Sequence, residues 1–262
     1  MSDEVRFIID SEKCIGCGQC VTTCQRRVLE IQNKKAVATG ANCFYCGHCL
    51  AICPQNAVRA SGCDDEIWEL SNDTAFLDEV SLKKHIKFRR SIRQYKETPV
   101  EKEKIEKIIE AGRITPTASN AQNVRYIVIQ NGIDAVEDAV LEQYNPSNAT
   151  QEHAVSLPYT FGIDRLKRGF LFHKAPLVIL NISPSEINAC LAAMSMELMA
   201  ESLGLGTVYV GLFTKPANKN KKLRESLGIK EDEIIAACLA IGYPKVQYRR
   251  TAPRAKANIV WR

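Results

Sequence analysis

The chain has 262 residues, of which 45% are hydrophobic and 25% are charged, and its formal net charge is +5. These values are ordinary for a globular protein, and no apolar run is long enough to cross a bilayer. The positive charge is spread along the chain and gives no basic stripe of the kind that binds nucleic acid. We therefore expect a cytoplasmic protein that acts neither on nucleic acid nor in a membrane.

Residues 1–62 are predicted to form a small first domain that is dominated by cysteine. Short strands are expected at residues 5–9, 28–31, 36–38 and 57–59. Eight of the eleven cysteines lie between Cys14 and Cys53, in two runs of the form Cys-x-x-Cys-x-x-Cys-x-x-x-Cys, and the second run repeats the first 29 positions later. The two runs are Cys14, Cys17, Cys20, Cys24 and Cys43, Cys46, Cys49, Cys53.

Three kinds of cross-link are compatible with clustered cysteines. Disulfides are disfavoured because closely spaced cysteines would close very small loops and a reducing compartment is expected. Zinc is the stronger alternative, but a structural zinc ion takes four ligands, usually as two separated pairs. A triplet plus a fourth cysteine in each run suits an iron–sulfur cubane, which needs one thiolate per iron. The spacing therefore favours two 4Fe–4S clusters.

With these runs, residues 1–62 resemble a bacterial two-cluster ferredoxin. The resemblance implies that the fourth cysteine of each run serves the other cluster. Cys14, Cys17 and Cys20 would then join Cys53, and Cys43, Cys46 and Cys49 would join Cys24. The first run departs from the family in one respect, since Gln25 follows Cys24 where the family has proline.

Residues 63–80 are predicted to be an acidic linker, and residues 81–262 a second domain. Helices are expected at 81–90, 100–113, 133–144, 185–203 and 219–227, strands at 124–130, 176–182, 208–213 and 234–242, and a loop or lid at 145–163. Helices and strands alternate without a simple repeat, which predicts an α+β sandwich with helices around a central sheet. Cys190 and Cys238 fall in apolar surroundings and are predicted to lie in its core.

A basic stretch opens the second domain. Arg89, Ser91 and Arg93 alternate and would face one way in an extended segment, where guanidinium and hydroxyl groups can hold a phosphate. A solvated basic turn explains these residues alone equally well.

Further motifs in order along the chain make residues 81–262 resemble the FMN-dependent nitroreductase family. They are Arg-x-Ser-x-Arg, the loop Thr-Pro-Thr-Ala-Ser-Asn-Ala-Gln, the turn Gly-Leu-Gly-Thr-Val-Tyr-Val-Gly and a basic tail. The resemblance implies an intertwined homodimer with FMN at its interface. It assigns FMN contacts to Arg89, Arg90, Ser91, Arg93, Pro116, Thr117, Ala118, Asn120, Tyr209, Val210, Gly211 and either Arg250 or Arg254.

The two resemblances together predict an iron–sulfur flavoprotein oxidoreductase. Electrons would come from the clusters, an external ferredoxin or NAD(P)H, and would reach a nitro, quinone or similar small acceptor through FMN. We name no catalytic side chain, because the flavin performs the redox chemistry and the protein positions it. The alternative function is a redox sensor or electron carrier whose flavin turns over no small substrate.

Overall fold

The computed structural model describes residues 6–39, 42–62, 65–71, 77–144 and 166–262. The chain divides into two compact units, Met1–Thr74 with Pro116–Asn123, and Ala75–Thr115 with Val124–Arg262. The domain boundaries expected at residues 62 and 81 stay predictions. The loop or lid expected at 145–163 lies outside the described residues, as does much of the acidic linker.

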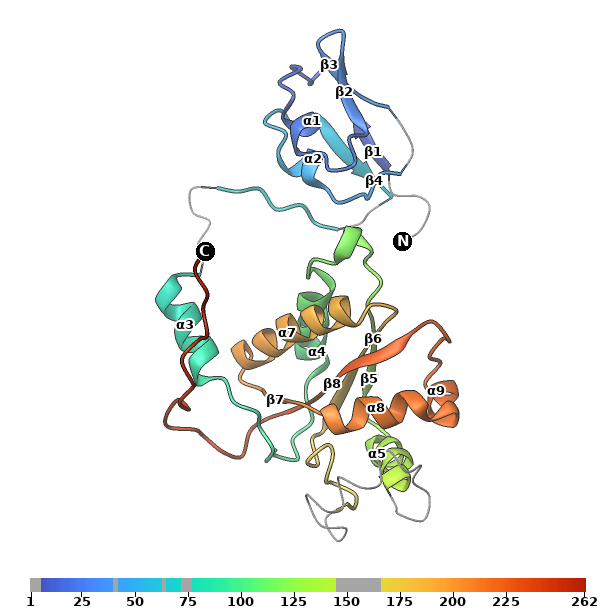
Figure 1. The fold of residues 1–262 in the computed structure, drawn as a ribbon, viewed down its shortest axis with the longest axis vertical. Coiled ribbons are helices and arrows are strands. Elements are labelled where there is room, and N and C mark those ends of the chain that lie inside the picture. Colours follow the sequence, from blue (N-terminus) through green and yellow to red (C-terminus); the bar gives the residue numbers. More distant parts are fainter. Residues whose placement is uncertain (1–5, 40–41, 63–64, 72–76, 145–165) are drawn as a thin grey trace. The chain divides into compact units, whose positions relative to one another are not determined.

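The described part of the first unit contains two small antiparallel sheets and two short α-helices (Figure 1). One sheet pairs β1 (Arg6–Ile9) with β4 (Val58–Ser61), and the other pairs β2 (Leu29–Gln32) with β3 (Lys35–Ala38). Asn33 and Lys34 both have positive φ and form the two-residue turn between β2 and β3, as tight hairpins require. The four expected strands of this unit are thus confirmed to within one or two residues.

The backbone conformation repeats together with the cysteine pattern. Helices α1 (Gln19–Thr23) and α2 (His48–Ala51) start after Gly18 and Gly47, whose φ angles are 78° and 75°. A left-handed residue at these two equivalent positions favours glycine. In the described part of this unit, the buried hydrophobic cluster is formed by Cys14, Cys20, Ala36 and Ala57, with Cys49 and Cys53 packed against it. So small a core is expected to need metal binding for stability.

The second unit is built on a four-stranded antiparallel sheet in the order β5-β6-β8-β7. These strands are β5 (Arg125–Ile129), β6 (Leu177–Ser183), β7 (Gly206–Tyr209) and β8 (Ile234–Gly242). All of β6 is buried, because the sheet is covered on both faces. Leu177 and Ile179 pack on one face, and Val178 and Leu180 on the other. The predicted α+β sandwich is confirmed.

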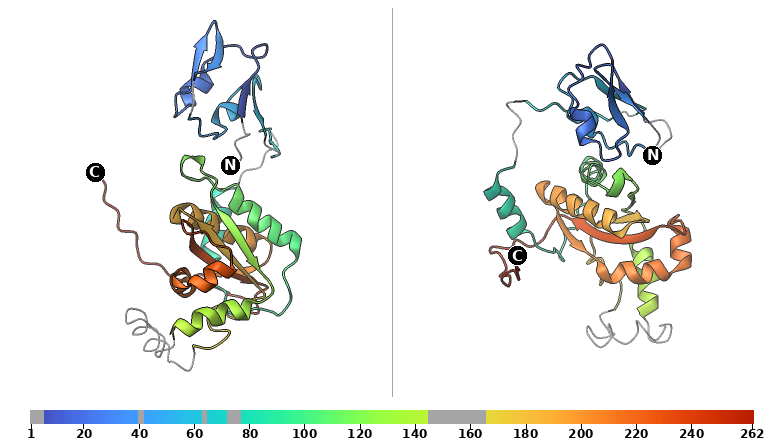
Figure 2. Two further views of the ribbon diagram at one scale, coloured as in Figure 1. Left: turned by 90° about the vertical axis from the view of Figure 1, so that its right-hand side faces the viewer. Right: turned by 45° about the horizontal axis from the view of Figure 1, so that its top comes forward.

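Helices form the two outer layers of this unit (Figure 2). Helices α4 (Lys102–Arg113) and α7 (Glu186–Ser202) cover one face, and α5 (Ile133–Leu141) and α8 (Gly211–Lys219) cover the other. Further helical elements among the described residues of this unit are α3 (Glu79–Phe88), α9 (Lys221–Ser226) and the 3₁₀ turn η2 (Glu142–Tyr144), and the 3₁₀ turn η1 (Ala118–Asn120) belongs to the first unit. No helix in the part of the chain that the structure describes is long and apolar enough to span a membrane.

One predicted strand is wrong in its second half. The expected strand at 208–213 ends at Tyr209, and helix α8 follows from Gly211. Pro216 lies inside this helix, and a proline there argues against a helix in the sequence because it removes the backbone hydrogen bond to the carbonyl of Leu212. The hydroxyl of buried Tyr144 donates to that carbonyl at 2.5 Å instead, so a distant side chain makes the helix tolerable.

Candidate functional site

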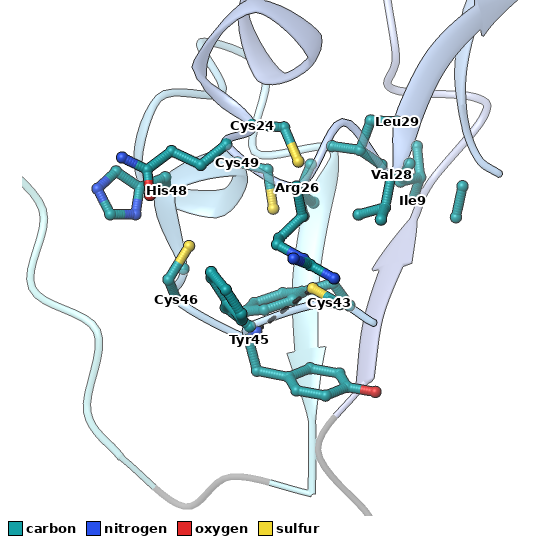
Figure 3. Close-up of a pocket in the computed structure, with 16 residues that line it drawn as sticks. Ile9, Cys24, Arg26, Val28, Leu29, Cys43, Tyr45, Cys46, His48 and Cys49 are labelled. Atoms are coloured by element: carbon teal, nitrogen blue, oxygen red, sulfur yellow. Dashed lines mark hydrogen bonds between the residues drawn. The ribbon is translucent and has the colours of Figure 1, made fainter. Parts of the chain in front are cut away.

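The eight cysteines of the repeat surround two cavities in the first unit. The first cavity is lined by Cys14, Cys17, Cys20 and Cys53, and the second by Cys24, Cys43, Cys46 and Cys49. Each cavity therefore draws three cysteines from one run and the fourth from the other run. Figure 3 shows the second cavity, with the sulfur atoms of its four cysteines around it. This is the grouping that the ferredoxin resemblance implies, and ligation of clusters by these thiols stays a prediction.

Backbone N–H groups point at three of these sulfur atoms. Ala36 donates to Sγ of Cys14, Tyr45 to Sγ of Cys43 and Ala57 to Sγ of Cys53, each over 3.3 Å. Such bonds stabilise thiolates and tune bound metal. The N–H of Ala36 lowers the pKa of Cys14 despite the burial of that thiol.

Burial raises the pKa of Cys49 to about 11. A thiol of this kind stays protonated at neutral pH unless a cation displaces its proton. Among the described residues, no group of three or more His, Cys, Asp or Glu side chains converges closely enough to hold a single metal ion. The thiols instead line the walls of cavities, of about 260 Å³ in the second site and about 20 Å³ in the first. Four thiols lie around each space, which is the number of thiolates that a 4Fe–4S cluster needs.

In the second unit, the structure brings two of the sequence motifs together. Ser91 forms a parallel bridge with Thr207 of β7, and the N–H of Ile92 donates to the carbonyl of Thr207 at 2.8 Å. The Arg-x-Ser-x-Arg segment therefore runs beside the strand that leads to Tyr209, Val210 and Gly211. Residues predicted to contact one flavin thus meet, although they are more than a hundred positions apart in the chain.

Arg89 is engaged inside the protein. Its Nη1 lies 3.1 Å from Oε1 of Glu197, whose side chain is only 2% exposed. The hydroxyl of Thr207 donates to the same carboxylate oxygen, also over 3.1 Å. A buried carboxylate with these two donors holds Arg89 in place and joins the segment to α7.

The guanidinium of Arg90, unlike that of Arg89, has no carboxylate partner among the described residues. Its Nη1 donates to the carbonyl of Arg89 at 2.6 Å, whereas its Nη2 is buried without any hydrogen-bond partner among the described residues. A buried guanidinium N–H that lacks an acceptor is costly, and an anion placed there would satisfy it. Arg93 is exposed. The motif thus offers unused donors of the kind that a phosphate accepts from.

Comparison with known proteins identifies both parts of the chain. A family model described as the nitroreductase family matches residues 86–243, which is more than half of the chain. The chain belongs to the nitroreductase family. A model described as a 4Fe–4S dicluster domain matches residues 6–54. This fusion of a ferredoxin-type domain to a nitroreductase domain is what the two resemblances predict.

Individual relatives agree with this identification. Ferredoxin-2 of Desulfomicrobium norvegicum is 63% identical over 30 residues, which cover 12% of this chain and 51% of that protein. The NADPH-flavin oxidoreductase of Vibrio harveyi is 26% identical over 172 residues, covering 65% of this chain and 68% of that protein. A nitroreductase with bound FMN from Bacteroides fragilis has a similar structure, with a TM-score of 0.57, 19% identity, and coverage of 71% of this chain and 100% of that one. At that identity, the structural likeness supports the fold alone.

The nitroreductase resemblance also selects residues in the first unit and in the C-terminal tail. Pro116, Thr117, Ala118 and Asn120 belong to the first unit. There, Nδ2 of Asn120 donates to the carbonyls of Phe44 and Tyr45 over 3.1 and 2.9 Å. Arg250 and Arg254 are both exposed in the tail that follows β8. The roles of these two groups of residues at the flavin stay predictions.

Sequence reasoning missed two glutamates of this nitroreductase domain. Glu197 and Glu201 lie one turn apart on α7, in a helix that is otherwise mostly apolar. Burial, together with the carboxylate of Glu197, raises the pKa of Glu201 to about 7. His85 lies beside it, with Nε2 3.3 Å from Oε2 of Glu201. Two acidic residues four positions apart inside an apolar helix were the available sign of such a pair.

We expect Glu201 to make stability depend on pH. Its pKa is raised from 4.5 to about 7 in the folded protein, so the folded state keeps a proton that the unfolded state loses. The free energy of unfolding should therefore fall as the pH rises from about 4.5 to 7, by on the order of 2 kcal/mol. Denaturant unfolding across this range should show the slope in the wild type and lose it in Glu201→Gln. Equal slopes in the two proteins would disprove the assignment.

Proposed function

We propose that this protein is an iron–sulfur flavoprotein oxidoreductase that holds two 4Fe–4S clusters and FMN. The observation that carries this proposal is the presence of both sites on one chain: four cysteines around each of two cavities, and in a nitroreductase domain an arginine, Arg90, whose buried Nη2 has no partner among the described residues. When bound, the clusters supply single electrons and FMN delivers them as pairs to an acceptor. The expected acceptor is a nitro, quinone or similar small compound.

The side chains of this chain have binding roles in this proposal. The cysteines of the two cavities hold the clusters, and Arg90, Ser91 and Arg93 bind the phosphate of FMN. Tyr209, Val210 and Gly211 line the flavin, with Pro116, Thr117, Ala118, Asn120 and Arg250 or Arg254 contributing in the dimer. The electron donor is NAD(P)H or an external reduced ferredoxin. The Vibrio harveyi relative is named for NADPH, which supports a nicotinamide donor.

We propose that the protein acts as a homodimer. Three large apolar side chains lie exposed along one face of α7, namely Ile187 (71% exposed), Leu191 (49%) and Met194 (39%). Their spacing of four and three positions places them on one stripe of the helix. An exposed apolar stripe of this kind favours burial against a second copy of the chain. Sedimentation analysis of the intact protein should give a dimer.

Arg90 is predicted to recognise the phosphate of FMN. Removing a charge-assisted hydrogen bond to a buried group costs roughly 1.5–3 kcal/mol, so Arg90→Gln should weaken FMN binding by about tenfold or more. Riboflavin, which lacks the phosphate, should bind the variant and the wild type alike. Flavin fluorescence quenching on the apo-protein measures both affinities. Lys87→Gln, which removes an exposed charge three residues away, is the matched control and should change neither affinity.

The second candidate function is a redox sensor or electron carrier without small-substrate turnover. The cluster-bearing unit favours it, because a ferredoxin-type domain on its own transfers electrons and transforms no substrate. Anaerobic turnover separates the two functions. Steady reduction of a nitroarene or a quinone by the holoprotein supports the oxidoreductase, and flavin reduction without turnover of either compound supports the carrier.

A further inference from the structure

Arg26 occupies a special place at the second cavity. It follows the ligand candidate Cys24 by two positions and lines that cavity. Its Nε donates to the carbonyl of Asn42 at 2.9 Å, and its guanidinium carbon lies 4.7 Å from the ring centroid of Phe44. Figure 3 shows the side chain extending from the neighbourhood of Cys24 toward Cys43. Arg26 is therefore fixed to the residues on either side of Cys43, and its charge is held at the wall of the second cavity.

The internal repeat shows that this cation belongs to one site only. With the offset of 29 positions, the counterpart of Arg26 at the first cavity is Gln55, and the counterpart of Phe44 is Ile15. Gln55 lines the first cavity as Arg26 lines the second. Among the described residues, the lining of the first cavity contains no lysine, arginine or histidine. An aromatic ring and a cation at one site thus correspond to two uncharged side chains at the other.

The first site has a cation nearby, but in a different position. Nζ of Lys35 donates to the carbonyl of Cys14 at 2.5 Å, and Lys35 is not part of the cavity lining. The sites also differ in hydrogen bonding, since two cysteines of the first site and one of the second accept a backbone N–H bond. Among the described residues that line either cavity, Arg26 is the one lysine or arginine, and His48 is the other basic side chain of the second cavity.

A positive charge beside a cluster favours its reduced form. Reduction by one electron adds a negative charge to the group that the four thiolates hold. Net charge, hydrogen bonds to sulfur and solvent exposure are the levers that set the potentials of such centres. The fixed positive charge of Arg26 makes the free energy of reduction more favourable at the second site. Because Arg26 is exposed, solvent screens part of this effect.

We propose that Arg26 raises the reduction potential of the cluster held by Cys24, Cys43, Cys46 and Cys49 above that of the other cluster. The inference rests on the proposed function, because it requires clusters in both cavities. Its consequence is a direction of transfer within the first unit. An electron that enters at the first site lowers its free energy by moving to the second, so the second site is where electrons accumulate.

Redox titration of the full-length holoprotein, followed by electron paramagnetic resonance under anaerobic conditions, tests this proposal. In Arg26→Gln, the more positive of the two midpoint potentials should fall. At a fixed potential the ratio of reduced to oxidised second cluster should drop about three- to tenfold, where tenfold corresponds to 59 mV for one electron. Arg26→Lys keeps the charge and should stay within about twofold of the wild type, since the effect is electrostatic.

Gln55→Arg is the matched control, because it places a cation at the equivalent position of the first site. It should raise the lower midpoint potential by a similar factor and leave the other one unchanged. If Arg26→Gln loses its cluster, redox titration of Gln55→Arg still tests the proposal. A lower midpoint potential that is the same in Gln55→Arg as in the wild type overturns it. Unchanged potentials in Arg26→Gln, or equal losses in Arg26→Lys and Arg26→Gln, also overturn it. Absence of iron and sulfide from the wild type would instead show that the proposed function itself is wrong.

Discussion

Replacing Cys24 by alanine is expected to remove the cluster from the second cavity, although Cys24 stands in the first cysteine run. Cys24 lines the cavity that Cys43, Cys46 and Cys49 also line, and Cys53 lines the other one. The variant should therefore lose half of its iron and sulfide. The loss should also destabilise the first unit, because two of the four residues in its buried cluster are cysteines and so small a core depends on metal binding.

Double variants decide which cavity Cys24 serves. Cys24→Ala combined with Cys46→Ala should lose no more iron than either change alone, because both affect the second site. Cys24→Ala combined with Cys20→Ala should lose all of the iron, since the two changes affect different sites. The reverse pattern would show that each run binds its own cluster. Cys238→Ala, at a fully buried position of the second unit, is the control and should leave the iron count unchanged.

The second large effect is expected at Glu137 in the second unit. This side chain is only 1% exposed, and its carboxylate accepts from the backbone N–H groups of Gly169 and Leu171 at 2.6 Å and of Phe172 at 3.0 Å. Glu137→Ala would leave three donors without their charged acceptor. We expect the free energy of unfolding of the second unit to fall by about 3–5 kcal/mol.

Denaturant unfolding followed by circular dichroism measures this effect, in the transition that belongs to the second unit. Glu137→Gln should lie between the wild type and Glu137→Ala, because an amide oxygen still accepts but carries no charge. Asp134→Ala is the control on the same helix, where the side chain is 66% exposed, and should change stability by less than about 0.5 kcal/mol. A loss below about 1 kcal/mol in Glu137→Ala would contradict this role.

Features that depend on local spacing could be predicted from the sequence. The spacing of the cysteines predicted two sets of metal-binding thiols, whereas their grouping across the two runs was implied by the ferredoxin resemblance. The strands expected at 176–182 and 234–242 match β6 and β8, and the helix expected at 185–203 matches α7, to within one residue at each end. In each case the relevant physical constraint acts over a few neighbouring residues.

Features that depend on distant partners could not be predicted in this way. Helix α8 tolerates Pro216 because Tyr144 supplies the missing donor. Cys190, predicted to lie in the core, is exposed, because the periodicity of an apolar helix does not reveal which of its faces remains uncovered. The pairing of Arg89 with Glu197 joins residues 108 positions apart. Because of that pairing, Arg89 has a structural contact, whereas the adjacent Arg90 keeps a buried N–H group without a partner among the described residues.

The transfer of electrons from the clusters to the flavin on one chain is tested most directly by rapid mixing. The holoprotein is mixed anaerobically with a reduced ferredoxin, and bleaching of the flavin absorbance is followed in the wild type and in a Cys24→Ala, Cys53→Ala double variant that retains FMN. We predict that the flavin of the wild type is reduced at least about tenfold faster than that of the variant, because its electrons arrive through the clusters. Equal rates in the two proteins would contradict this route.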